Sequence, residues 1–298
     1  MARATTAEIS ATSKASAASA TATRQAVARA RRRRQLAEWA SRIALLAFIL
    51  GGWQLCTAAF TGPLVDPFFW GRPSGIVRRL IRFFQEGTEF GSYWDQIGVT
   101  LEEAVLGFLV GAAAGIIVGV ALGQSDFLAR VVGPFIKVVN AIPRIVLGSL
   151  FVVALGLGLS SKVLLAAVLV FFVVFFNAFQ GVREVDRNVV ANARVLGAKP
   201  MQIIRHVTLP SALTWIIASL HTAFGFAIIG ALVAEVLGAQ KGLGLVVKTA
   251  QNTFDPNGVF AVIVTVAVIT LVAEFLLTWL ERRLLAWRPP TSSESPLI

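Results

Sequence analysis

The chain has 298 residues, of which 56% are hydrophobic and 14% are charged, whereas an ordinary soluble domain has about 25% charged residues. The apolar residues fall in blocks long enough to cross the roughly 30 Å hydrocarbon core of a bilayer. This composition excludes a water-soluble globule and favours a single all-α membrane domain.

The formal net charge of +11 is concentrated at one place in the sequence. Arginines crowd directly before the first apolar block, among them residues 31–34. Such placement is typical of membrane topology and does not favour a nucleic-acid partner. The single cysteine, Cys56, excludes an internal disulfide framework, and two scattered histidines predict no metal site.

Residues 1–38 are rich in Ala, Ser and Thr and end in a basic run. This composition predicts a disordered basic cytoplasmic tail. A transit peptide and a signal sequence remain alternatives, because both share parts of this bias. We expect a transmembrane domain over residues 39–288 and a short cytoplasmic tail over residues 289–298.

The apolar blocks predict about six transmembrane helices, with the third the weakest because Lys137 and Arg144 lie in or near it. The blocks cover residues 43–60, 104–123, about 131–161, 163–182, 207–234 and 259–280. Six spans place both termini on one side of the membrane. The basic residues of the tail, of the loop around 183–206 and of the C-terminal end predict that this side is cytoplasmic.

The connection between the first two spans disagrees with this charge rule, because it carries Arg72, Arg78, Arg79 and Arg82 on the outer side. The spacing of apolar residues over 76–84 predicts an amphipathic helix on the membrane surface, with its arginines facing lipid headgroups.

Glycine recurs at every fourth position in the second span, at Gly107, Gly111, Gly115 and Gly119. A stripe of small residues lets helix backbones approach closely, so we expect ordinary tight packing within a bundle.

The loop between the fourth and fifth spans, about residues 183–210, predicts a helix, a turn and a second helix. Asp186 suits the N-cap of the first helix, Gly197 its left-handed end, and Pro200 the first turn of the second. Met201, Ile204 and Val207 follow at helical spacing, so the second helix presents an apolar face in a basic loop. Such a face predicts a protein partner.

This loop resembles that of permease subunits of bacterial ATP-binding-cassette importers, whose pattern is E-A-A, three residues, G, nine residues and I-x-L-P. Gly197, Val207, Leu209 and Pro210 fall in register. Ala193 matches the second alanine, whereas Asn192 replaces the first and Ala191 replaces the glutamate.

Further stretches at 140–145, 177–186 and 234–244 resemble the branch of these permeases that handles nitrate, sulfonate, taurine and related small solutes. The resemblance covers roughly residues 40–285. In that branch Ile142-Pro143-Arg144 is usually followed by a second proline, but Gly148 and Ser149 stand near that place here. A softer or displaced helix kink is therefore expected.

The resemblance implies a type I importer permease bundle in a bacterial inner membrane, which is not itself an enzyme. It implies two cytoplasmic ATPase subunits that hold ATP and magnesium, a second permease subunit in a homodimer, and an extracytoplasmic solute-binding protein, with lipid around the spans. The residues it assigns to the ATPase-coupling loop are Asn192, Ala193, Gly197, Met201, Ile204, Val207, Leu209 and Pro210.

Ionisable and amide groups within spans are functional candidates. Arg144, Asn177 and Glu235 are candidates for the translocation pathway. The alternatives are snorkelling or an ion pair for Arg144, an interhelical hydrogen bond for Asn177, and a helix cap or gate for Glu235.

Other polar residues predict structural roles. His221 is expected to be satisfied within the bundle, Glu274 to pair with a buried arginine, and Glu102 and Glu103 to lie at the interface. No arrangement of nucleophile, acid and base emerges.

The sequence leaves two further classes of protein to weigh. A secondary transporter or channel, not driven by ATP, would show inverted repeats or an acidic relay, and neither is clear. A membrane enzyme would need a catalytic cluster at one membrane face.

Overall fold

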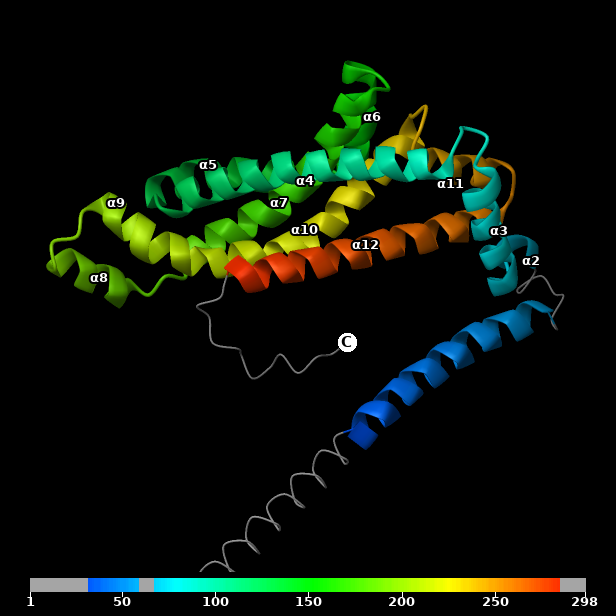
Figure 1. The fold of residues 1–298 in the computed structure, drawn as a ribbon. Helices are drawn as coiled ribbons and strands as arrows, with labels where there is room; N and C mark the ends of the chain where they lie inside the picture. Colours follow the sequence, from blue (N-terminus) through cyan, green and yellow to red (C-terminus); the bar gives the residue numbers. More distant parts are fainter. Residues whose placement is uncertain (1–31, 59–66, 285–298) are drawn as a thin grey trace, which may run out of the picture. The chain divides into compact units, whose positions relative to one another are not determined.

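The computed structural model describes residues 32–58 and 67–284, and these residues are almost entirely helical (Figure 1). Their only β-type pairing is a single bridge between Thr88 and Gly91. Both predicted tails are affected by this limit. The C-terminal tail, residues 289–298, lies outside the described residues, and so do residues 1–31 of the N-terminal tail. Residues 32–38, expected in that tail, already belong to a helix.

The chain divides into two units, residues 1–67 and 68–298. In the described part of the first unit, the helix Arg32–Ala58 is long and apolar enough to cross a membrane. It begins 11 residues before the predicted span at 43. Its apolar side chains, such as Ile43 and Phe48, are exposed, as suits a helix whose backbone is satisfied internally and whose surface faces lipid.

The second unit contains both short and long helices. In chain order they are α2 (Pro67–Trp70), α3 (Pro73–Glu86), α4 (Tyr93–Gly123), α5 (Asp126–Ala141), α6 (Arg144–Leu155), α7 (Leu159–Arg183), α8 (Arg187–Val195), α9 (Pro200–Ile203), α10 (Leu209–Leu237), α11 (Leu243–Asn252) and α12 (Pro256–Leu284). Within the described residues five helices are candidate spans, and six if the bent pair α5 and α6 counts as one. The expected all-α bundle of about six spans is confirmed.

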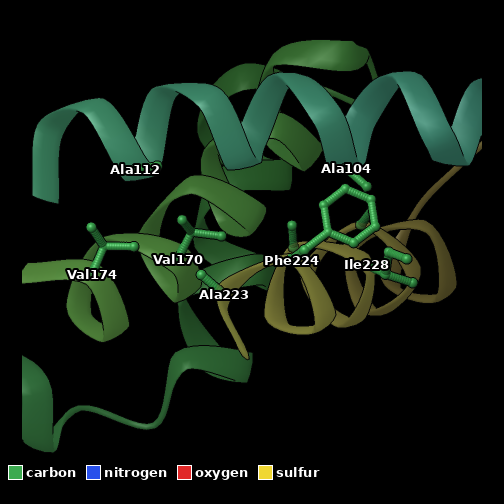
Figure 2. Packing of buried hydrophobic residues seen from close by; sticks show 9 residues of the cluster. Ala104, Ala112, Val170, Val174, Ala223, Phe224 and Ile228 are labelled. Atoms are coloured by element: carbon green, nitrogen blue, oxygen red, sulfur yellow. The ribbon is translucent and has the colours of Figure 1, made fainter. Parts of the chain in front are cut away.

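The core lies where α4, α7 and α10 pack together (Figure 2). Small and β-branched side chains fill it, including Ala104, Val170 and Ala223. The predicted close approach is confirmed: a Cβ on Gly107 would lie 2.4 Å from the Ala166 Cβ atom. The glycine stripe therefore brings the backbone of α4 against α7.

The predicted third span corresponds to two helices, α5 and α6, which meet at an angle of 85°, as in a broken span or a re-entrant loop. Ile142 and Pro143 at the break have extended backbone conformations. Proline has no N–H to continue the helix of α5, and it disfavours a helical conformation at the residue before it. This bend is sharper than the softer kink that was expected, and the alternative of a displaced kink stays a prediction.

The predicted amphipathic helix exists as α3, but it packs on protein as well as facing outward. Ile76 and Phe83 are buried, and α3 contacts α12 and α4. The Phe83 ring stacks on the Tyr93 ring with 5.1 Å between centroids. One side of α3 is therefore part of the bundle.

Candidate functional site

Two short helices, α8 and α9, stand at one end of the bundle (Figure 1). Asp186 caps α8, because its Oδ1 accepts the backbone N–H of Asn188 at 2.8 Å. At the other end Gly197 has φ +83°. Its N–H bonds to the carbonyl of Arg194, and that of Ala198 to the carbonyl of Ala193. This pair of bonds is a Schellman motif, so the predicted helix end at Gly197 is confirmed.

The next helix starts as predicted at Pro200, which is its first residue. The Gln202 side chain accepts the N–H of Lys199 at 2.8 Å and closes the turn. Proline is favourable at this position, because the N–H that it lacks would have no partner within the helix. The loop therefore has two capped helices joined by a tight corner.

The second loop helix does not end before span five. It passes through a π turn, Ile204–Thr208, into α10, so that Pro200–Leu237 forms one 38-residue helical run. The N–H of Leu209 bonds to the carbonyl of Ile204, five residues back. A wide turn suits Pro210, which lacks an N–H and would crowd a carbonyl four residues before it. Pro210 thus lies inside a continuous helix instead of at the start of a separate one.

The apolar face of the loop differs from the predicted one. Met201 is 70% exposed, but Ile204 and Val207 are partly buried. The exposed apolar residues beside the corner are Val195 and Leu196, at 87% and 85%. We call Val195, Leu196 and Met201 the tip patch. Val195 and Leu196 directly precede Gly197, whereas the predicted face lies entirely on the second helix.

A hollow of about 690 Å³ separates this loop from the body of the bundle. Ala191, Arg194 and Ile203 line it from the loop side, and Arg183 lines it from the end of α7. Arg183 also pairs with Asp126 at 2.7 Å. Ala191, where the related permeases carry glutamate, therefore faces the hollow.

A buried polar cluster lies where α4 and α10 meet the N-terminus of α11. The first N–H groups of a helix have no partner within it. Here Gly242 N–H donates to Gln96 Oε1 at 2.8 Å, Leu243 N–H to Thr100 Oγ1 at 2.8 Å, and Gly244 N–H to Glu235 Oε2 at 2.6 Å. Three side chains from two other helices therefore cap α11.

Glu103 and Lys162 continue this cluster between α4 and α7, with Nζ and Oε1 3.2 Å apart. Both residues are buried within the protein, at 0% and 5% exposure, and the interfacial position of Glu103 stays a prediction. Lys162 lies between the predicted third and fourth spans. Gln96, Thr100, Glu103 and the glycine stripe follow at spacings of three and four, a pattern that places all of them on one face of α4.

His221 joins α10 to two glutamates of α12. Its Nδ1 lies 2.7 Å from Glu274 Oε1 and its Nε2 lies 3.1 Å from Glu281 Oε2. His221 is satisfied within the bundle as predicted. Glu274 is paired as expected, but with a histidine instead of an arginine.

The three candidate pathway residues are not joined to one another by these bonds. The Arg144 guanidinium donates to Asn140 and lies 5.2 Å from the centre of the Phe172 ring. Asn177 donates to the carbonyl of Val173 at 2.8 Å, within its own helix. Glu235 is fully buried and accepts from Thr100 and Gly244. Its contacts are those of a helix cap, and the pathway role of all three stays a prediction.

Residues 32–58 and 67–284 contain no group of three His, Cys, Asp or Glu side chains able to hold a metal ion.

A bundle of up to six apolar helices with a capped loop that ends in exposed apolar residues defines a multi-pass membrane component with a surface suited to a partner. Residues 111–286 match the family of binding-protein-dependent transport system inner membrane components. The chain belongs to this family, which makes it a transport permease and not an enzyme.

Several proteins similar to this chain are also named transport permeases. The chain is 32% identical over 255 residues to the putative aliphatic sulfonates transport permease protein SsuC of Bacillus subtilis, covering 86% of this chain and 90% of the relative. It is 30% identical to the taurine transport system permease protein TauC of Escherichia coli, covering 82% and 88%. It is 31% identical to the riboflavin transport system permease protein RibX of Chloroflexus aurantiacus, covering 68% and 76%.

The fold is similar to that of a chain in the inward-facing MetNI methionine ABC transporter. The TM-score is 0.52 at 20% sequence identity, with 64% of this chain and 93% of that chain covered. The resemblance supports the expected type I permease fold.

Proposed function

We propose that this permease moves a small sulfonate, of the taurine or alkanesulfonate type, into the cell, and that ATP hydrolysis on a separate ATPase subunit drives the movement. The tip patch supports the coupling to an ATPase, because Val195 and Leu196 are among the most exposed apolar side chains of the described residues. Exposed apolar residues in a rigid loop are typical of a protein interface. Two relatives named for sulfonates and taurine support the substrate class over nitrate.

The same proposal includes the other components. Two ATPase subunits would hold ATP and magnesium and contact the loops of two copies of this permease. A solute-binding protein would deliver the sulfonate from outside. The basic loop around 183–206 supports a cytoplasmic position for α8, α9 and both termini, since cytoplasmic loops carry an excess of Lys and Arg.

Charged substitutions in the tip patch are expected to uncouple the permease from its ATPase. Leu196→Asp would place a charge at a surface that must lose water on docking, which costs several kcal/mol. We expect at least about a hundredfold weaker copurification with the ATPase encoded beside this permease. The control is Leu157→Asp, at a residue 47% exposed between α6 and α7. Retention of the ATPase by the Leu196 variant would contradict the docking role.

Transport of a sulfonate can be measured in proteoliposomes that contain the permease and its ATPase, with the solute-binding protein outside. Labelled taurine should enter only with ATP in the ATPase compartment, and alkanesulfonates should compete better than nitrate or riboflavin. Competition by riboflavin alone would overturn the substrate class. Uptake driven by an imposed ion gradient without ATP would instead support the secondary transporter.

A further inference from the structure

Helix α3 lies at the end of the bundle opposite α8 and α9 (Figure 1). A basic pocket lies beside α3. Its volume is about 470 Å³. Arg78, Arg79 and Arg82 line it from α3, and Thr253, Asp255 and Asn257 line it from the turn between α11 and α12. The arginines are one and four residues apart, so they share one side of the helix.

The charges of this pocket do not balance. Among the described residues that line it, Asp255 is the only carboxylate, and both of its oxygens are engaged. Oδ2 lies 2.7 Å from Arg79, and Oδ1 accepts the N–H of Gly258 at 3.0 Å. Among the described residues, Arg78 and Arg82 form no ion pair, and Arg78 donates only its Nε–H, to the carbonyl of Ser74. Two guanidinium groups thus remain without an anion.

The walls of the pocket are held in place before any ligand binds. Asn257 Oδ1 accepts the N–H of Arg72 at 3.0 Å, which fixes the start of α3 to the start of α12. The Arg79 guanidinium lies 5.0 Å from the centre of the buried Phe83 ring. Tyr93, which stacks on Phe83, bonds through its hydroxyl to Thr265 at 2.7 Å. These contacts hold Arg79 and the helix ends that frame the pocket, whereas the side chains of Arg78 and Arg82 are exposed.

We propose that this pocket binds a tetrahedral oxyanion, a phosphate or sulfonate group, between Arg78, Arg79 and Arg82. The guanidinium fork matches two oxygens of such a group, and charge-assisted bonds to it are strong. The guanidinium groups repel one another, and their attraction to an anion between them offsets this repulsion. The group has two possible sources, a lipid headgroup at the membrane surface or a free anion in solution. Binding of an oxyanion here is independent of the proposed coupling to an ATPase.

The test compares both sources on the purified full chain in neutral detergent. Native mass spectrometry measures retained phosphatidylglycerol against diacylglycerol, which lacks the phosphate. Thermal denaturation measures stabilisation by inorganic phosphate and methanesulfonate against chloride at equal ionic strength. The variant Arg78→Gln/Arg82→Gln keeps the pair of Arg79 and Asp255. The matched control Arg282→Gln removes an exposed charge from the far end of α12.

We expect the double variant to bind the preferred oxyanion at least about tenfold more weakly, since a hydrogen bond to a charged group is worth about a tenfold change or more. Preference for phosphatidylglycerol alone assigns a headgroup, and stabilisation by the soluble anions alone assigns a free anion. The proposal is overturned if the native chain prefers neither, if the double variant binds normally, or if Arg282→Gln weakens binding equally.

Discussion

Replacing Lys162 by methionine is expected to destabilise the helix bundle by about 3–5 kcal/mol, because it leaves a buried carboxylate without its cation. Lys162 and Glu103 are buried and lie 3.2 Å apart. Within a membrane domain no water is available to replace the lost partner. Thermal or denaturant unfolding of the purified chain in detergent measures the loss.

The double variant Glu103→Met/Lys162→Met separates a lost ion pair from lost packing. Removing both charges is expected to recover part of the stability, since a buried ion pair can often be replaced by apolar residues at little cost. The recovery is incomplete because the buried Glu235 also loses its electrostatic attraction to Lys162. Lys137→Met, at an exposed lysine, serves as the control and should unfold like the native chain. Equal destabilisation of the double variant and Lys162→Met would contradict the pairing.

Replacing Gly242 by alanine is expected to cost about 3–5 kcal/mol of stability for two reasons that add. Gly242 has φ +113°, a conformation that strains any residue with a Cβ. The new Cβ would also lie 2.0 Å from Glu235 Oε1. Because the carboxylate would have to move, the N–H of Gly244 and the hydroxyl of Thr100 would lose their buried acceptor.

Gly225→Ala provides the matched control for this prediction. Gly225 lies inside α10, and a Cβ there would meet nothing within 4 Å. We expect no loss of stability, since alanine is favoured over glycine in a helix. The capping role of Glu235 would be contradicted if Gly242→Ala and Gly225→Ala unfolded at the same temperature.

The two ends of the permease are connected by one helical run. Pro200–Leu237 contains 38 residues, about 57 Å of helix at 1.5 Å per residue. Met201 of the tip patch stands near its start, and Glu235, which caps α11, stands near its end. A continuous helix moves as a unit, so under the proposed function a displacement of the loop by the ATPase would reach the cap of α11.

Local sequence signals predicted much of this structure. Asp186, Gly197 and Pro200 predicted the ends of the loop helices correctly, because a cap depends on residues next to it in the chain. The glycine stripe predicted close helix packing for a similar reason, since its spacing already defines one face of α4. The apolar blocks predicted the number of spans, because their length must match the bilayer.

Contacts between distant residues were decided by the folded bundle. Nothing near Lys162 in the chain identifies Glu103 as its partner, because 59 residues separate their numbers and only the packing of α4 on α7 brings them together. The same applies to Glu235, whose capping role depends on where α11 begins beside it, and to His221 between two carboxylates of α12. In the loop, Leu196 is exposed and Ile204 partly buried because of how α8 and α9 face the bundle, and this orientation is a property of the assembled helices.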